Sequence, residues 1–268
     1  MYKQLEEFVF HKRLKQPFKA LAAILTAAFF TCLVPLLAIA APPITPRYKH
    51  FWLPDAASTY APKIDAMFNM ILWITMVVFF LVEVTMLVFL IKYRYKPDRR
   101  ATYTHGNNRL EIVWTAIPAV ILVYLAIFSN TLWSEIRDPN KFPKGASSIE
   151  IRPRQFEWDI TYPGPDGKFG TKDDIATINQ LYLVKDKPVQ IKLEGQDVIH
   201  SFFVPEFRIK QDAVPGMPTA VWIQPTMGGN FEIACAELCG LGHYRMKGFV
   251  SVVSQDSLDN WLKIQSAP

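Results

Sequence analysis

Long apolar runs and short alternating segments divide the chain into two kinds of sequence. Apolar residues dominate 21–41, 67–91 and 112–133. Each run has the length, about 20 residues, that a helix needs to cross a bilayer. From residue 149 onward, short runs alternate between apolar and polar positions, and turn residues separate them. This pattern predicts membrane-spanning helices followed by a β-rich domain.

Eight segments of the C-terminal part have strand character. Short strands at this spacing, separated by turns such as PGPDGKFG and VPGMP, predict an antiparallel β-sandwich or barrel. Ser254 is a suitable N-cap for a short final helix, QDSLDNWLKI. The expected fold class is therefore a transmembrane helical hairpin followed by an all-β domain. The eight segments are IEIRP, QFEWDITY, QLYLV, VQIKLE, DVIHSFFVP, AVWIQP, NFEIAC and GFVSVV.

The charge pattern predicts how the chain is threaded through the membrane. Residues 92–110, in the loop between the second and third apolar runs, carry Asp98 as the single acid against six basic residues, and such loops stay on the cytoplasmic side. We therefore expect 42–66 and everything after Trp133 to lie outside the cytoplasm, with 67–133 as the hairpin. The basic residues are Lys92, Arg94, Lys96, Arg99, Arg100 and Arg109.

Residues 1–41 have the features of a targeting segment. A basic stretch precedes the apolar run, and Ala38-Ile39-Ala40 offers an A-x-A cleavage site. A signal peptide is one interpretation, and an uncleaved membrane helix is the other. Within the second run, Glu83 is an ionisable group at membrane depth, which indicates either a functional role or a buried partner.

The net charge of +5 belongs to the membrane flanks. The segment 134–268 carries 15 Lys and Arg against 17 Asp and Glu. Nucleic acid is therefore a poor partner, because phosphate binding needs clustered positive charge. The acidic insert at 163–174 lacks the ligand spacing of an EF-hand, so we predict a solvated loop. A cation bound through Asp166, Asp173 and Asp174 is the alternative.

The stretch CAELCGLGHYRM, residues 235–246, concentrates metal-binding chemistry, and His200 lies on an earlier strand. Cys235 and Cys239 could form a disulfide, or together with His200 and His243 a zinc site. Thiolate, imidazole and thioether together are typical of copper electron-transfer sites, so Met246 favours copper. Two thiolates could bridge two ions, and such a filled site leaves no open position for a substrate.

The segments HSFFVPEFRIKQDAVPG and CAELCGLGHYRMKGFV resemble subunit II of the haem–copper cytochrome c oxidases, over residues 67 to 264. The resemblance implies a cupredoxin domain in 134–268 with a binuclear CuA centre. It implies that both cysteines bridge the coppers and that each histidine binds one. The other two implied ligands are weak, and the Glu237 carboxylate would also reach a magnesium ion. The implied copper ligands are His200, Cys235, the Glu237 carbonyl, Cys239, His243 and Met246.

Two further segments carry the resemblance. In LEIVWTAIPAVIL, Glu111 occupies the family's acidic position near the mouth of a proton channel. In RQFEWDITYPG, Phe156 replaces the usual electron-entry tryptophan, and Trp158 follows it. Asp197 and Glu157 are candidates for a docking surface for the donor.

The implied function is electron entry into an oxidase. The domain would take electrons from cytochrome c and pass them to the haem and copper centres of subunit I, where oxygen reduction drives proton pumping. Implied partners are subunits I and III, cytochrome c and the lipid bilayer, in a bacterial-type inner membrane with the C-terminal domain outside. The sequence contains no CxxCH motif, so the donor's haem is not attached to this chain.

Four related functions are alternatives to this one. Quinol oxidase subunits lack these cysteines and histidines, and nitrous oxide reductase has tryptophan in place of Glu237 and no hairpin. A copper-carrying assembly factor would not need Glu111 or Glu237. A partner subunit of a nitric oxide reductase with the same copper centre remains open.

Overall fold

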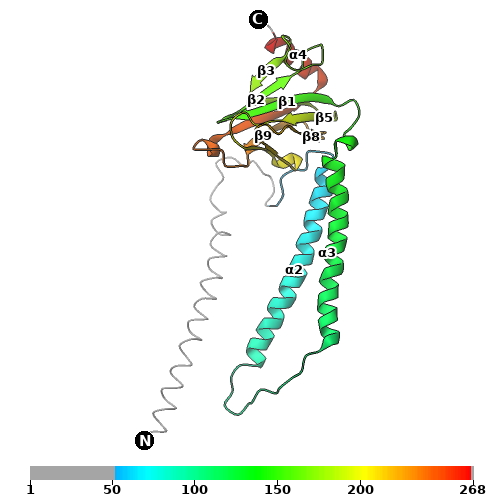
Figure 1. Ribbon diagram of the computed structural model, residues 1–268, viewed down its shortest axis with the longest axis vertical. Coiled ribbons are helices and arrows are strands. Elements are labelled where there is room, and N and C mark those ends of the chain that lie inside the picture. Colours follow the sequence, from blue (N-terminus) through cyan, green and yellow to red (C-terminus); the bar gives the residue numbers. More distant parts are fainter. Residues whose placement is uncertain (1–51, 267–268) are drawn as a thin grey trace. The chain divides into compact units, whose positions relative to one another are not determined.

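The computed structural model describes residues 52–266 (Figure 1). They form two long helices, a ten-stranded β-domain and a short C-terminal helix, α4 (Gln255–Gln265). The predictions for residues 1–41 lie outside the described residues.

Two apolar helices, α2 (Ala61–Lys92) and α3 (Asn108–Arg137), form the predicted hairpin and lie side by side (Figure 1). Both are long and apolar enough to cross a membrane. The Asn107 side chain caps α3 by accepting hydrogen bonds from the backbone N–H groups of Arg109 and Leu110. Both helices extend beyond the predicted spans, because Ala61 and Ile136 at their outer ends are buried against the β-domain.

The β-domain is a sandwich of two five-stranded sheets, with strand orders β3-β2-β1-β5-β8 and β4-β10-β9-β6-β7. Most neighbours are antiparallel, as expected, but β1 pairs with β5 and β10 with β4 in parallel. The strands are β1 (Ser147–Arg154), β2 (Glu157–Tyr162), β3 (Ile175–Ile178), β4 (Gln180–Val184), β5 (Val189–Leu193), β6 (His200–Val204), β7 (Ile209–Ala213), β8 (Thr219–Ile223), β9 (Gly229–Cys235) and β10 (Lys247–Val253).

Two strands, β3 and β7, have no counterpart among the eight predicted segments. β3 has only four residues, and β7, with the sequence IKQDA, contains three polar residues. Both lie at the ends of their sheets. An edge strand is paired on one side and exposes more polar side chains, so its hydrophobic alternation is weak.

The core lies between the sheets and reaches the ligand candidates. The alternating burial of β1 and β2 places Ile151, Trp158 and Ile160 inside, and β6 contributes Phe202. The Trp158 and Phe202 rings meet edge to face, with centroids 5.8 Å apart. Cys239 and Met246 belong to the same buried cluster, so the core packs directly against the candidate metal centre.

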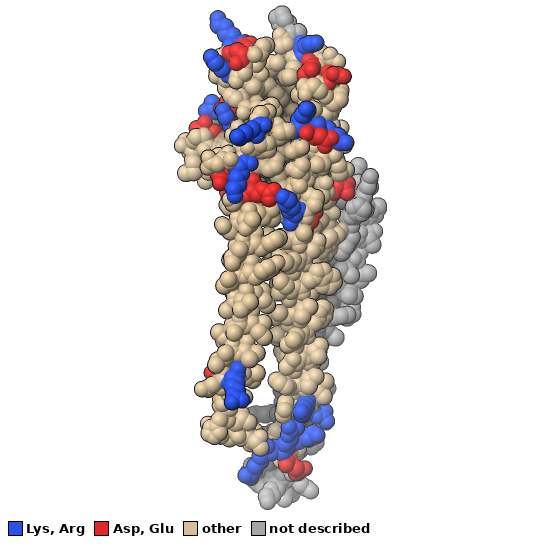
Figure 2. Space-filling model, turned by 90° about the vertical axis from the view of Figure 1, so that its right-hand side faces the viewer, with Lys and Arg blue, Asp and Glu red and all other residues tan. Residues whose placement is uncertain are grey.

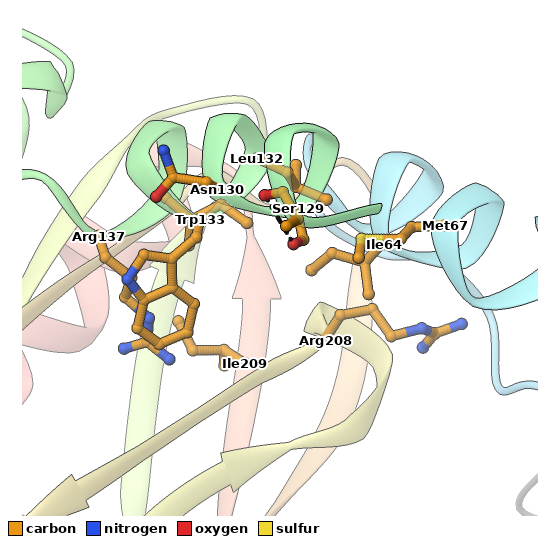
Figure 3. A pocket seen from close by; sticks show the side chains of 11 residues that line it. Ile64, Met67, Ser129, Asn130, Leu132, Trp133, Arg137, Arg208 and Ile209 are labelled. Atoms are coloured by element: carbon orange, nitrogen blue, oxygen red, sulfur yellow. Dashed lines mark hydrogen bonds between the residues drawn. The ribbon is translucent and has the colours of Figure 1, made fainter. Parts of the chain in front are cut away.

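The hairpin is fixed to the sandwich through a mixed junction. Tyr60 Oη donates to the Trp222 carbonyl at 3.1 Å, and the Arg208 guanidinium holds both carboxylate oxygens of Asp65 at 2.7 and 2.9 Å. Arg137 bonds to Gln211. Arg137 and Arg208 also line a cavity of about 550 Å³, together with residues of α2 and α3 and with Ile209 at the start of β7 (Figure 3). The outer helix ends therefore determine where the β-domain is held.

Charge is distributed unevenly along this part of the molecule. The helix surfaces are almost free of charged side chains, whereas Lys and Arg gather at the loop end of the hairpin (Figure 2). That loop is the basic segment with Lys92, Arg94 and Arg109. Charged side chains of both signs reappear where the helices meet the β-domain, for example in the ion pair of Lys63 with Glu135.

The C-terminal helix begins as predicted. The Ser254 hydroxyl accepts a hydrogen bond from the Ser257 backbone N–H, which is an N-cap. Trp261 of α4 stacks on Tyr182 of β4, with ring centroids 4.1 Å apart. The helix therefore packs on strands that carry no ligand candidate.

Candidate metal centre

Strand register brings together ligand candidates that are far apart in the sequence. His200 is the first residue of β6, Cys235 is the last residue of β9, and Phe202 pairs with Cys235 across these strands. The loop 236–246 then returns to β10. Its ends are tied to the strands, because Ala236 N–H donates to the Ser201 carbonyl and Cys235 N–H donates to the Met246 carbonyl.

The donor atoms of the loop surround one small volume. Cys235 Sγ and Cys239 Sγ are 3.8 Å apart. His200 Nδ1 lies 3.9 Å from the first sulfur, and His243 Nδ1 lies 3.7 Å from the second. Met246 Sδ lies 3.8 Å from Cys239 Sγ. The Glu237 carbonyl oxygen lies 3.3 Å from Cys235 Sγ. All six sequence-predicted ligand positions are therefore adjacent.

The two cysteines are free thiols in this arrangement. Their separation of 3.8 Å is far above the roughly 2.05 Å of a disulfide. Within residues 52–266, one group of three or more His, Cys, Asp or Glu side chains lies close enough together to hold a metal ion. Its members are His200, Cys235 and Cys239. The structure thus supports a metal centre rather than a disulfide bond between the two cysteines.

The two thiols differ in acidity for identifiable reasons. Burial raises the pKa of the Cys235 thiol, but hydrogen bonding with His200 and with the backbone of Glu237 outweighs burial and lowers its pKa to about 6. Burial and then the nearby negative charge of Cys235 raise the pKa of Cys239 to about 12. Cys235 is therefore the thiolate of the pair near neutral pH, and Cys239 loses its proton only when a bound cation replaces it.

A carboxylate orients the buried histidine. Asp197 Oδ1 lies 2.9 Å from His200 Nε2, which leaves Nδ1 facing the sulfurs. Burial lowers the pKa of His200, but hydrogen bonds with Cys235 and Asp197 outweigh it, and the pKa is raised overall. A carboxylate on the far nitrogen of a metal-binding histidine fixes the ring and increases its basicity. The sequence had suggested Asp197 only for a docking surface.

The tip between β1 and β2 covers the loop, and it adds Gln155, which the sequence did not predict, to the predicted Phe156. Gln155 N–H donates to Asp197 Oδ2 at 2.8 Å, and the Gln155 side chain donates to the Cys239 carbonyl. The half-buried Phe156 ring packs on Gly240 and Gly242, and a Cβ on Gly242 would lie 2.4 Å from the ring. No local sequence signal marks Gln155, because its partners are more than forty residues away.

Trp158, the second aromatic residue predicted on this segment, lies deeper in the domain than Phe156. Trp158 is fully buried and meets the His200 ring with centroids 6.5 Å apart. Its indole Nε1 has no hydrogen-bond partner among the described residues. Phe156 thus contacts the loop from outside, while Trp158 packs beside His200 from inside.

The remaining candidates lie away from this cluster or at its edge. Glu111 is in the first turn of α3, at the loop end of the hairpin, and Glu83 is half-buried on α2. Glu237 is exposed on the copper-ligand loop. In the acidic insert, Asp166 and Asp174 accept backbone N–H groups of their own loop, which agrees with a solvated turn.

The donor set fits copper better than zinc. A tetrahedral zinc site would be complete with two thiolates and two imidazoles. Here Met246 is also buried, with its sulfur beside Cys239, so a soft thioether belongs to the donor set. Thiolates, imidazoles and an axial thioether are the ligands of copper electron-transfer sites. The residues present therefore fit a copper centre.

Comparisons with known proteins agree with this chemistry. Residues 46–132 match the family model for the transmembrane domain of cytochrome c oxidase subunit II, and residues 159–253 match the model for its periplasmic domain. The chain is 32% identical over 241 residues to alternative cytochrome c oxidase subunit 2 of Bradyrhizobium diazoefficiens, covering 81% of this chain and 85% of the relative.

Other relatives have the same description. Cytochrome c oxidase subunit 2 of Thermostichus vulcanus is 28% identical over 272 residues, covering 82% of this chain and 80% of the relative. The crystal structure of the periplasmic domain of subunit II of cytochrome oxidase from Bradyrhizobium japonicum is 28% identical, with a TM-score of 0.41, and covers 46% of this chain and 95% of that one.

The family has a copper site in its periplasmic domain and works with other oxidase subunits and cytochrome c. The cluster of His200, Cys235 and Cys239 is consistent with that site. The two apolar helices and the β-domain correspond to the two family models in turn. The chain is thus a membrane protein with a periplasmic C-terminal domain, and it belongs to the cytochrome c oxidase subunit II family.

Proposed function

We propose that this chain is the electron-entry subunit of a respiratory cytochrome c oxidase. It accepts electrons from cytochrome c and passes them to subunit I, where oxygen is reduced and protons are pumped. The observation that carries this proposal is the convergence of two thiols, two imidazoles, a thioether and a backbone carbonyl on one small volume. This ligand set belongs to a copper pair.

The proposed ligands have different roles in holding the two copper ions. Cys235 and Cys239 would hold both ions between them, and His200 and His243 would each hold one. Met246 and the Glu237 carbonyl are the weaker ligands. When bound, the copper pair supplies one-electron redox chemistry. The protein holds its donors rigid, because a core and a hydrogen-bonded loop leave little room for rearrangement between redox states.

The routes into and out of the centre follow from the contacts. Phe156 packs on the ligand loop and is the proposed entry residue, and Trp158 supports it beside His200. The exposed Glu237 carboxylate is a candidate magnesium ligand at the border with subunit I. Glu111, at the opposite end of α3, is the proposed proton-entry carboxylate.

The proposed organisation has four parts. Residues 1–41 are a signal peptide or an uncleaved helix, 42–66 an extracytoplasmic segment, 67–133 the two-span hairpin and 134–268 the cupredoxin domain. The helix surfaces are exposed in this chain and apolar on all sides, which suits contact with lipid and with subunits I and III. The proposed location is a bacterial-type inner membrane.

Metal content and spectroscopy test the central claim. The full-length chain, purified in detergent and loaded with copper, is expected to bind two coppers that share one unpaired electron in the electron paramagnetic resonance spectrum. One copper, or zinc in preference to copper, would overturn the proposal. With the complete complex, oxygen consumption tests the oxidase assignment, and turnover of nitric oxide in its place would indicate the related reductase.

A further inference from the structure

The cavity at the outer end of the hairpin lies where the predicted membrane spans end. Met67 and Trp133, the outermost residues of the two apolar runs, both line it, and Ile209 lines it from the β-domain (Figure 3). Its volume of about 550 Å³ is within the range of roughly 300–1,000 Å³ that is typical of ligand sites. Ala126, Asn130 and Trp133 in the lining are exposed, so the cavity is open along the helix surface.

One face of α3 supplies most of the lining. Ala126, Ser129, Trp133 and Arg137 follow one another at spacings of three and four residues and therefore share that face. Ala126 and Ser129 are small, which leaves space between α3 and the larger side chains of α2. The Arg137 guanidinium lies over the Trp133 ring, 5.1 Å from its centroid (Figure 3). The cavity is thus mainly apolar toward the membrane and has a cation at its outer end.

The two arginines of the lining differ in how their charges are compensated. The Arg208 guanidinium holds both carboxylate oxygens of Asp65 and donates to two backbone carbonyls. Arg137 donates to the Gln211 side chain and to the Lys210 carbonyl, and both of these acceptors are neutral. Arg208 therefore has a counter-ion in its own chain, whereas the hydrogen bonds of Arg137 leave its positive charge uncompensated.

The other carboxylates of this junction are bonded to other bases. Glu135 pairs with Lys63. Asp212 interacts electrostatically with Arg137, but its carboxylate forms an ion pair with Lys210, 3.0 Å away. In the part of the chain that the structure describes, Arg137 is thus the one charged lining residue without an ion pair.

A phosphate attached to an apolar chain matches this arrangement. A guanidinium has five N–H donors in a planar fork that suits phosphate oxygens, and the bonds to Gln211 and Lys210 engage two of the nitrogens of Arg137. An apolar space is a poor site for water, and at a membrane surface the acyl chains of lipids are the apolar groups that can fill it. Asn130 lies seven residues before Arg137, about 10 Å nearer the membrane centre, where its amide can donate to the ester groups of a lipid.

We propose that the cavity binds one anionic phospholipid of the periplasmic leaflet. Its phosphate pairs with Arg137, and an acyl chain lies between α2 and α3, beside Met67 and Ala126. A headgroup with a net negative charge, such as phosphatidylglycerol, binds better than a zwitterionic one, because the lining described above contains no carboxylate for an amine. The inference is independent of the copper assignment and requires only that the hairpin spans a membrane.

Lipid titration of the full-length chain in detergent tests the site. Phosphatidylglycerol and phosphatidylcholine are added in turn to the delipidated chain, and native mass spectrometry measures the bound lipid. We expect a preference for phosphatidylglycerol, and Arg137→Gln should weaken its binding about fivefold. Arg94→Gln, which removes an arginine at the loop end of the hairpin, is the matched control and should bind like the unmodified chain. Equal binding of the two lipids, or equal binding by Arg137→Gln and the unmodified chain, would overturn the proposal.

A second variant tests the acyl-chain part of the site and leaves Arg137 in place. Ala126→Phe fills the space between the helices, so it should also weaken phosphatidylglycerol binding. Ala119→Phe is its control, because Ala119 lies two turns nearer the loop on the same face of α3 and outside the lining. Phosphatidylglycerol should raise the midpoint of thermal unfolding of the unmodified chain and of Ala119→Phe more than that of Ala126→Phe. An equal rise in all three would contradict the proposed position of the chain.

Photo-crosslinking in the complete oxidase identifies what occupies the cavity in the assembled complex. Trp133→p-benzoylphenylalanine places a photoreactive aromatic group in the lining. A product heavier by the mass of one phospholipid would support the proposal. A cross-link to another oxidase subunit, or to a second copy of this chain, would show that protein covers the cavity and would overturn it.

Discussion

His200 and the donors of the loop 236–246 reach the same centre by different structural routes. His200 is fully buried at the start of a strand, its backbone fixed by sheet pairing and its ring by Asp197. Cys239, His243 and Met246 lie on a loop whose only regular structure is a single 3-10 turn, His243–Arg245. The loop is held by its ends and by the Gln155–Phe156 tip above it.

The difference shows two ways of making a metal site rigid. A strand ligand inherits its position from the sheet, so only the ring orientation needs a further partner. Loop ligands have no such frame, and they depend on packing and on backbone hydrogen bonds from elsewhere in the domain. The following substitutions test this contrast, ordered by their expected effect on copper binding.

Replacing a bridging cysteine should have the largest effect. In Cys235→Ser or Cys239→Ser, the soft thiolate is lost and no neighbouring sulfur can replace it, so we expect the paired copper signal to disappear. Copper per chain and the electron paramagnetic resonance spectrum measure this. Cys32→Ser, at the one cysteine outside the ligand loop in this sequence, is the control and should retain the pair. Two coppers retained in Cys235→Ser would refute the ligand assignment.

Removing the carboxylate behind His200 should have the next largest effect. Asp197→Ala leaves His200 Nε2 without its partner, and loss of such a partner typically lowers metal affinity about 10–100-fold. Competition with a copper chelator measures the affinity. Asp197→Asn should lose less, since its amide oxygen still accepts a hydrogen bond, and Asp166→Ala should lose nothing. Unchanged affinity in Asp197→Ala would mean that sheet pairing alone positions the histidine.

A methyl group in the loop should have a smaller effect on copper and a clear effect on stability. In Gly242→Ala, the new Cβ would meet the Phe156 ring at 2.4 Å, so the tip or the loop must move. We expect a loss of about 1–3 kcal/mol in the free energy of unfolding and a few-fold loss of copper affinity. Gly228→Ala is the control, because its Cβ has only one ordinary contact, at 3.6 Å. Equal results for the two variants would show that the tip does not hold the loop.

Replacing the Met246 thioether should leave copper bound. Met246→Leu keeps a buried apolar side chain of similar size, so the loop should retain its packing while the thioether donor is lost. We expect the copper stoichiometry to stay the same and the reduction potential to change, which protein-film voltammetry measures. Loss of one copper would instead make Met246 a structural ligand.

Local pattern was sufficient for the elements that depend on nearby residues. The hairpin spans, the polarity of the loop between them, the Ser254 cap and most of the strands follow from hydrophobic runs, charge bias and alternation. The edge strands β3 and β7 and the parallel pairings could not be predicted in this way. Pairing between distant segments depends on both partners and has little effect on the sequence pattern of either one alone.

The candidate ligands were predictable because their chemical types are rare and closely spaced in CAELCGLGHYRM. Their supporting residues were not, since Asp197 and Gln155 are ordinary polar residues whose importance comes from what lies beside them in space. The sequence therefore determined the membrane spans and the donor atoms, which are properties of residue type and local order. Only the tertiary structure decided which side chains orient those donors, because that depends on contacts between segments that strand register alone brings together.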